Sequence, residues 1–193
     1  MRARSDSRPA IVPIALTATA ILSFLLWADL RPAARAQGPR SVGALTLSSP
    51  AFEAGRAIPA PYTCTGAGRS VPLVIDGVPD GARSLALIVD DPDAPKGGFT
   101  HWLVYNLPPS TRRIQAGASG GGLPAGAVEG RSDSGRVGYA PPCPPRGRHH
   151  YVFTLYALDA QLPSLGAVSR QRLEAALDRH ILERATLVGT YAR

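Results

Sequence analysis

Cysteine is scarce in this sequence, and the spacings in which cysteine and histidine bind zinc are missing. Cys64 and Cys143 are the two cysteines among 193 residues, and neither belongs to a CxxC pair or a cysteine–histidine cluster. An internal repeat and a serine or cysteine nucleophile motif are also absent. These absences argue against a zinc module and a repeat array, and they give no support to nucleophilic catalysis.

Clustered positive charge is missing too, although the formal net charge is +7. The residues before Gln37 hold five arginines and two acids, and the basic residues of the remainder are spread singly. Proteins that bind nucleic acid usually gather their positive charge in a patch or a stripe. The sequence therefore predicts a soluble surface with interspersed arginines and no nucleic-acid partner.

Long apolar runs are absent except for one near the N-terminus, Ala10–Trp27, which follows an arginine-bearing start. After it comes Ala34-Arg35-Ala36, a small-x-small pattern typical of a signal-peptide cleavage site. The run is long for a signal peptide and short for a membrane-spanning helix, so we interpret residues 1–36 as a signal peptide or an uncleaved membrane anchor. Either way, we expect a periplasmic or secreted domain, with membrane contact only through this segment.

Export bears on the two cysteines, because disulfides persist in oxidising compartments. A bridge between Cys64 and Cys143 is one hypothesis, and two buried free thiols are the other. Sequence spacing does not decide between them, since bridging depends on the distance between the two Cα atoms.

Proline and glycine are abundant, with 19 prolines and 20 glycines. The short apolar runs between them favour a mainly β, loop-rich domain over residues 45–193, after a linker of residues 37–44. We expect strands at Ala44–Leu47, Tyr62–Cys64, Pro72–Ile75, Ser84–Val89, His101–Leu107, His150–Leu158 and Ala185–Tyr191, and a short C-terminal helix from Ser169 to about Arg179. Eight glycines between Ala116 and Gly138 predict a long irregular loop.

Acidic and histidine side chains are expected to meet at one rim of this fold. Asp91 and Asp93 lie in an acid–proline loop that ends an apolar strand, and His101 begins the next strand. If these two strands pair as neighbours, the carboxylates and the imidazole share one sheet edge. His149 and Tyr151 follow a second proline-rich segment, and their spacing of two directs them to the same face of a strand.

Several blocks of the sequence resemble the phosphatidylethanolamine-binding protein family, and in particular its bacterial YbhB/YbcL-type Raf-kinase-inhibitor-like branch. The blocks are Asp91-Pro92-Asp93-Ala94-Pro95, Gly98-Phe99-Thr100-His101-Trp102 and Pro144-Pro145-Arg146-Gly147-Arg148-His149-His150-Tyr151. They occur in the family's order, and the resemblance extends from Leu45 to Arg193. It implies a β-sandwich-like fold without a cofactor, and a small anion pocket at one end lined by Asp91, Asp93, His101, Pro145, His149 and Tyr151.

The residue types of this implied pocket suit a phosphate or a phospholipid headgroup. Imidazole and phenol groups donate hydrogen bonds to phosphate oxygens. A carboxylate can hold a histidine in its charged form, or it can meet the ammonium group of ethanolamine. We therefore expect a non-catalytic domain that binds a small anionic ligand.

Other functions stay open at this point. The domain could be a protein-interaction module that inhibits a protease or a kinase, as some members of the family do. It could instead be an enzyme that uses His149 or His101 as a general base oriented by Asp91, or the Cys143 thiol if that cysteine is unpaired. Asp91, Asp93 and His101 are also metal-ligand types, but their spacing is not diagnostic of a metal site.

Overall fold

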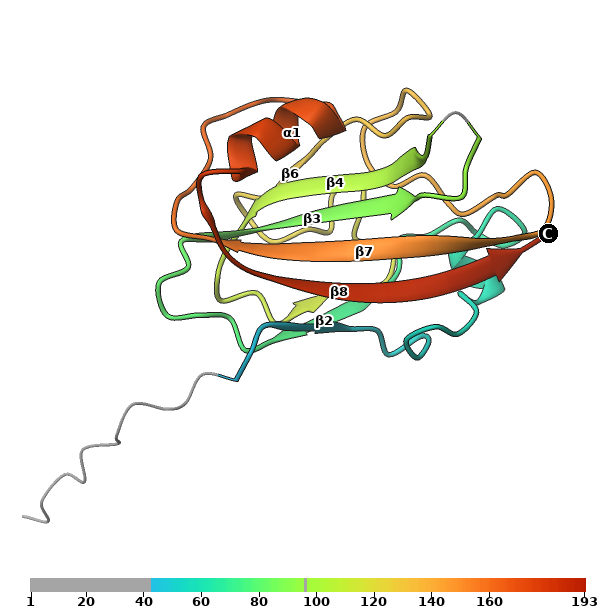
Figure 1. Ribbon diagram of the computed structural model, residues 1–193, viewed down its shortest axis with the longest axis horizontal. Helices are drawn as coiled ribbons and strands as arrows, with labels where there is room; N and C mark the ends of the chain where they lie inside the picture. Colours follow the sequence, from blue (N-terminus) through green and yellow to red (C-terminus); the bar gives the residue numbers. More distant parts are fainter. Residues whose placement is uncertain (1–42, 96) are drawn as a thin grey trace, which may run out of the picture. The chain divides into compact units, whose positions relative to one another are not determined.

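The apolar run that ends in the acid–proline loop forms the middle strand of a five-stranded antiparallel sheet. A computed structural model describes residues 43–95 and 97–193, so the predicted leader lies outside the described residues. Strand β3 (Ser84–Asp91) pairs with β4 (Phe99–Leu107) on one side and with β7 (Arg148–Leu158) on the other. The short β6 (Val128–Glu129) and the long β8 (Ile181–Ala192) complete the order β6-β4-β3-β7-β8 (Figure 1).

A second, three-stranded antiparallel sheet packs against the first. Its order is β1-β2-β5, formed by Thr46–Ser48, Leu73–Asp76 and Arg113–Ile114. Apolar side chains from both sheets make one buried core, for example Ile75 of β2 and Phe153 of β7. The mainly β, sandwich-like fold predicted from the sequence is therefore confirmed.

Both faces of β3 are buried, which explains why its sequence is apolar throughout instead of alternating. Leu85, Leu87 and Val89 pack in the core between the two sheets. Ala86 and Ile88 face the other way, into a smaller core. A strand buried on both sides is a rigid support for the loop that follows it.

Helix α1 (Arg170–Leu177) covers the outer face of the five-stranded sheet (Figure 1). Leu173 and Leu177 are buried in the smaller core, as the helical spacing of the apolar residues predicts. An ion pair links the start of the helix to the sheet, with Arg170 Nη1 2.9 Å from Asp90 Oδ1. Among the described residues, no helix is both long enough and apolar enough to cross a membrane.

The strand expected at Tyr62–Cys64 is wrong. Ala60–Tyr62 forms a 3-10 helix with a proline in its first turn. The N–H and Oγ1 of Thr63 both donate to the Ala60 carbonyl, at 3.0 and 3.1 Å. Proline fixes φ and removes a donor, so Pro61 favours a tight turn over a place in a β-ladder.

Two other segments hold more regular structure than the sequence predicts. Strand β6 lies inside the stretch expected to be an irregular loop, and it pairs with β4 through Val104 and Tyr105. The last strand begins at Ile181, before the predicted start at Ala185. This last strand therefore pairs with β7 from Arg148 to Leu158.

Candidate functional site

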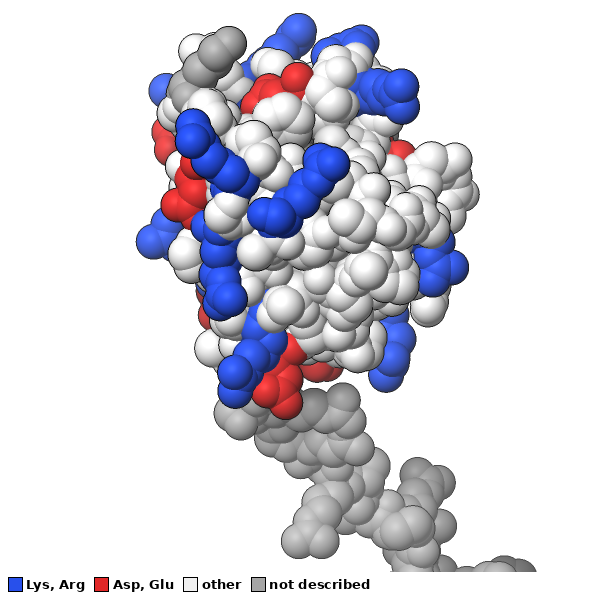
Figure 2. All heavy atoms as spheres, turned by 90° about the vertical axis from the view of Figure 1, so that its right-hand side faces the viewer, with Lys and Arg blue, Asp and Glu red and all other residues white. Residues whose placement is uncertain are grey.

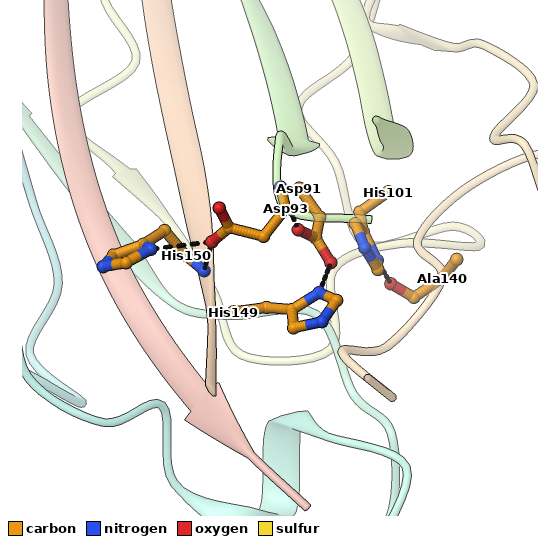
Figure 3. A network of polar contacts seen from close by, with 6 residues as sticks. All are labelled: Asp91, Asp93, His101, Ala140, His149 and His150. Carbon is orange, nitrogen blue, oxygen red and sulfur yellow. Dashed lines mark hydrogen bonds and ion pairs between the residues drawn. The ribbon is translucent and has the colours of Figure 1, made fainter. Parts of the chain in front are cut away.

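The acid–proline loop lies at the end of the five-stranded sheet where β3 ends and its neighbours begin. Asp91, the last residue of β3, pairs with Phe99, the first residue of β4. The antiparallel register brings the start of β7 to the same end. His101 of β4 and His149 of β7 consequently lie beside Asp91 (Figure 3).

A buried histidine–aspartate pair fixes the His149 ring. Nδ1 of His149 lies 2.7 Å from Oδ2 of Asp91, and the two residues are 7% and 3% exposed. An ionised carboxylate only accepts hydrogen bonds, so Nδ1 is the donor and Nε2 is left for another partner. The second oxygen, Asp91 Oδ1, accepts the Asp93 N–H at 2.9 Å, which holds the loop against the strand end.

His101 is fixed in a similar way by a backbone carbonyl. Its Nδ1 donates to the Ala140 carbonyl oxygen at 2.7 Å, which again leaves Nε2 for another partner. The ring packs on Phe99 and on Tyr151, with ring centroids 4.7 and 5.1 Å apart. Burial lowers the pKa of His101 below its ordinary value, and the Ala140 bond and the Asp91 charge oppose this effect only in part.

Both imidazole rings line a cavity of about 290 Å³. The lining residues are Asp91, Ala94, Pro95, Phe99, His101, Ser134, Ala140, Pro141, Cys143, Pro144, Pro145 and His149. Most of these side chains are apolar, and the acid–proline loop and the second proline-rich segment supply most of them. A small, mainly apolar cavity with a few convergent polar groups is typical of a site for a small ligand.

Asp93 is turned away from this cavity and is not among its lining residues. Its Oδ2 accepts the N–H and the Nδ1–H of His150, at 2.8 and 2.7 Å (Figure 3). These hydrogen bonds lower the pKa of Asp93. Both residues are exposed, so the pair fastens the loop to the outer side of β7. In the described part of the chain, no three His, Cys, Asp or Glu side chains gather as metal ligands.

Pro145 lines the cavity, whereas Tyr151 lies behind the His101 ring and is not a lining residue. Tyr151 is fully buried, and its hydroxyl has no hydrogen-bond partner among the described residues. Burial and the nearby Asp91 carboxylate raise the pKa of this phenol, so it stays protonated. Buried polar groups are nearly always hydrogen-bonded, so this hydroxyl without a partner is unusual.

Cys64 and Cys143 are joined by a disulfide, with their Cα atoms 5.4 Å apart. Cys143 belongs to residues 140–145, which form a proline-rich wall of the cavity. The bridge therefore fastens this proline-rich wall to the segment around Cys64. A backbone hydrogen bond of 3.0 Å from the Cys64 N–H to the Pro142 carbonyl supports the same link. Neither cysteine is free, which removes the thiol chemistry that an unpaired Cys143 would offer.

Sequence reasoning missed two features of the site. The Ala140 carbonyl that fixes His101 is a backbone group, and no residue type signals it. The Phe99 ring did leave a signal, because Phe99 and His101 are two residues apart on a strand and therefore share a face.

Known proteins resemble this chain over most of its length. Residues 48–192 match the family described as phosphatidylethanolamine-binding protein. A UPF0098 protein of Methanothermobacter thermautotrophicus is 45% identical over 150 residues, which cover 77% of this chain and 99% of that protein. The crystal structure of a phosphatidylethanolamine-binding protein homologue from Chlamydia trachomatis has a TM-score of 0.73 at 43% identity, covering 78% of this chain and 98% of that one.

A more distant structural relative has the same fold. YbcL of Escherichia coli, described as a member of the mammalian phosphatidylethanolamine-binding protein family, has a TM-score of 0.73 at 32% identity. The similarity covers 77% of this chain and 98% of YbcL. Sequence blocks, family match and fold agree, and the chain belongs to the phosphatidylethanolamine-binding protein family.

Proposed function

We propose that this domain is an exported, non-catalytic protein whose cavity binds a small anion, either phosphate or the phosphate of a headgroup. The observation that carries the proposal is the pair of imidazoles, His101 and His149, which line one cavity with Nδ1 already bonded. Each ring therefore has Nε2 as its one remaining hydrogen-bonding atom.

A phosphate group suits two rings held in this way. A protonated Nε2 donates a charge-assisted hydrogen bond to an anionic oxygen, and both rings are fixed before the ligand arrives. The apolar walls exclude water, which strengthens each of these contacts.

Two further observations support the export and the non-catalytic role. The Cys64–Cys143 disulfide is a bond that persists outside the cytoplasm. A histidine that activates a nucleophile of its own protein contacts the hydroxyl or thiol of that nucleophile. Among the described residues, the hydrogen bonds of His101 and His149 go to a carbonyl and a carboxylate instead.

Titration calorimetry of the full-length protein with inorganic phosphate and with phosphorylethanolamine tests the proposal. We expect saturable binding that weakens at least tenfold in His149→Ala, because a hydrogen bond to a charged group is worth about 1.5–3 kcal/mol. The matched control is His180→Ala. His180 also bonds an aspartate through Nδ1, 2.8 Å from Asp159 Oδ1, but this pair is exposed and does not line the cavity.

Two results would contradict the proposal. One is a wild-type protein that binds neither compound. The other is a His149→Ala variant that is folded by circular dichroism and binds both compounds with the same number of sites and the same affinities as His180→Ala.

A further inference from the structure

A second cavity, of about 460 Å³, lies at the C-terminal end of β8. Its lining residues are Gly55, Arg56, Ala57, Ile58, Arg148, Thr190, Tyr191 and Ala192. None of them lines the histidine cavity. The two charged residues of the lining are both arginines, Arg56 and Arg148, and no acid accompanies them.

The backbone next to Arg56 is firmly placed. Residues 55–58 run alongside β8, with the Gly55 N–H donating to the Val188 carbonyl at 2.7 Å. Thr190 then bonds this segment twice, accepting the Ile58 N–H at 2.7 Å and donating to the Arg56 carbonyl at 2.9 Å. The backbone of Arg56 is therefore fixed on one side of β8, and its side chain extends from there.

Arg148 reaches the cavity from the other side of β8. It is the first residue of β7 and pairs with Ala192 in the β7–β8 register. His149 follows it directly, and successive residues of a strand point to opposite faces of the sheet. One face of β7 thus contributes His149 to the first cavity, and the other face contributes Arg148 to the second.

No acid neutralises either arginine within the described residues. The ion pairs found there involve Arg170 and three histidines, but neither Arg56 nor Arg148. His150 lies on the same outer face of β7 as Arg148. The ion pair of Asp93 is with His150 and not with Arg148. Figure 2 looks onto this end of the domain, where basic side chains surround a face without charged groups and acidic side chains lie among those on the left.

We propose that Arg56 and Arg148 form a second anion site, which takes a phosphate group, free or in a headgroup ester, independently of the histidine cavity. A guanidinium presents parallel N–H donors that match two phosphate oxygens, and it stays charged at any physiological pH. Two such groups in a cavity without a carboxylate make a site for an anion.

Phosphate titration of the full-length His149→Ala protein at about pH 9 isolates this site, because imidazoles are ordinarily neutral there and guanidinium groups stay charged. We expect saturable binding in this background, and at least a tenfold loss of affinity when Arg56→Gln and Arg148→Gln are added. Arg172→Gln with Arg179→Gln is the control. It removes the same charge from exposed arginines on and after helix α1, and it should leave the affinity unchanged.

A parallel titration with glycerophosphoglycerol, a phosphate diester, distinguishes a headgroup from free phosphate, and binding of either compound supports the site. Two results would overturn it: neither compound binds, or the two glutamine pairs weaken binding equally, which indicates diffuse charge attraction. The two cavities share no residue. Failure here therefore leaves the His149 result untouched, and failure of the histidine cavity leaves this titration valid.

Discussion

The described histidines all have Nδ1 bonded, and they differ in what holds it and in how deeply the ring is buried. His150 and His180 bond exposed aspartates, whereas His149 bonds a buried one and His101 a buried carbonyl. An exposed pair contributes little, because water competes for both partners. The buried rings therefore carry the chemistry of this end of the sheet, and their protonation decides what they can donate.

Binding of sulfate to the histidine cavity is expected to strengthen as the pH falls. In the free protein, burial keeps the pKa of His101 below its ordinary value of 6.5, so the ring is neutral at pH 7 and its Nε2 does not donate. A bound dianion raises that pKa, and binding takes up a proton. The affinity should then rise by up to about tenfold per pH unit as the pH falls from the raised pKa of the bound ring towards the pKa of the free ring.

Calorimetry at a series of pH values measures this change, and sulfate is the suitable probe because it does not titrate in this range. His101→Gln should flatten the profile, while His180→Gln should leave it as in the wild type. A wild-type affinity that does not change with pH would contradict the role given to His101.

The residues of the histidine cavity are easier to predict from the sequence than the groups to which they are hydrogen-bonded. Asp91, His101 and His149 stand in blocks that resemble a known family, and the structure brings them together. Successive side chains of a strand point to opposite faces, so the sequence alone places His149 and His150 on different faces of β7. It does not say that Asp93 turns to His150, because that depends on how the acid–proline loop folds back on Asp91.

Among the structural elements, the glycine-rich stretch of residues 116–138 is fastened by backbone hydrogen bonds and, in addition, by one carboxylate, that of Glu129. Its Oε1 accepts the Trp102 Nε1–H and the Ser119 hydroxyl, both at 2.6 Å, and its Oε2 accepts the Gly120 N–H at 2.8 Å. The Ser119 hydroxyl oxygen in turn accepts the Tyr139 N–H at 2.8 Å. This network ties the stretch to β4 and to the start of the segment that carries the proline-rich wall.

Glu129→Ala should therefore loosen the stretch and lower the free energy of unfolding by about 3 kcal/mol, since it leaves three donors without their charged acceptor. Urea unfolding measures the loss. Trypsin should cut faster after Arg131 and Arg136, which lie in the same stretch. Glu53→Ala is the control, an exposed carboxylate whose loss should stay within about 0.5 kcal/mol. Unchanged cleavage would show that the glycine-rich stretch does not depend on Glu129.

The elements that the sequence predicts well are those with long apolar or alternating runs, β3, β4 and β7. Two-residue strands such as β5 and β6 have no periodicity to detect, and their place follows from partners distant in the sequence. The sequence favours a strand at Tyr62–Cys64 because Tyr and Thr are common in sheets, whereas the prolines before them decide the local geometry and a 3-10 helix forms at Ala60–Tyr62.

Across the whole domain, the disulfide links segments that are far apart in the chain. Cys64 and Cys143 are 79 residues apart, and strands β2 to β6 lie between them. Closing a loop of this length restricts the unfolded chain, with an expected stabilisation of about 4 kcal/mol on the chain-entropy account.

The double variant Cys64→Ser/Cys143→Ser should lose about this much of its free energy of unfolding, measured by urea unfolding without reductant. A thiol reductant should lower the stability of the wild type to a similar extent and leave the variant unchanged. Equal stability of variant and wild type would show that the disulfide does not stabilise the domain.

The place of this bridge in the cavity wall also bears on how the protein matures. A chain kept in a reducing environment holds every polar group of the cavity, yet it lacks the covalent link at Cys143 that fastens the proline-rich wall. Completion of the wall is therefore a chemical step that comes after synthesis. It depends on an oxidant as well as on the sequence, and the cavity first exists in its final form when the thiols are oxidised.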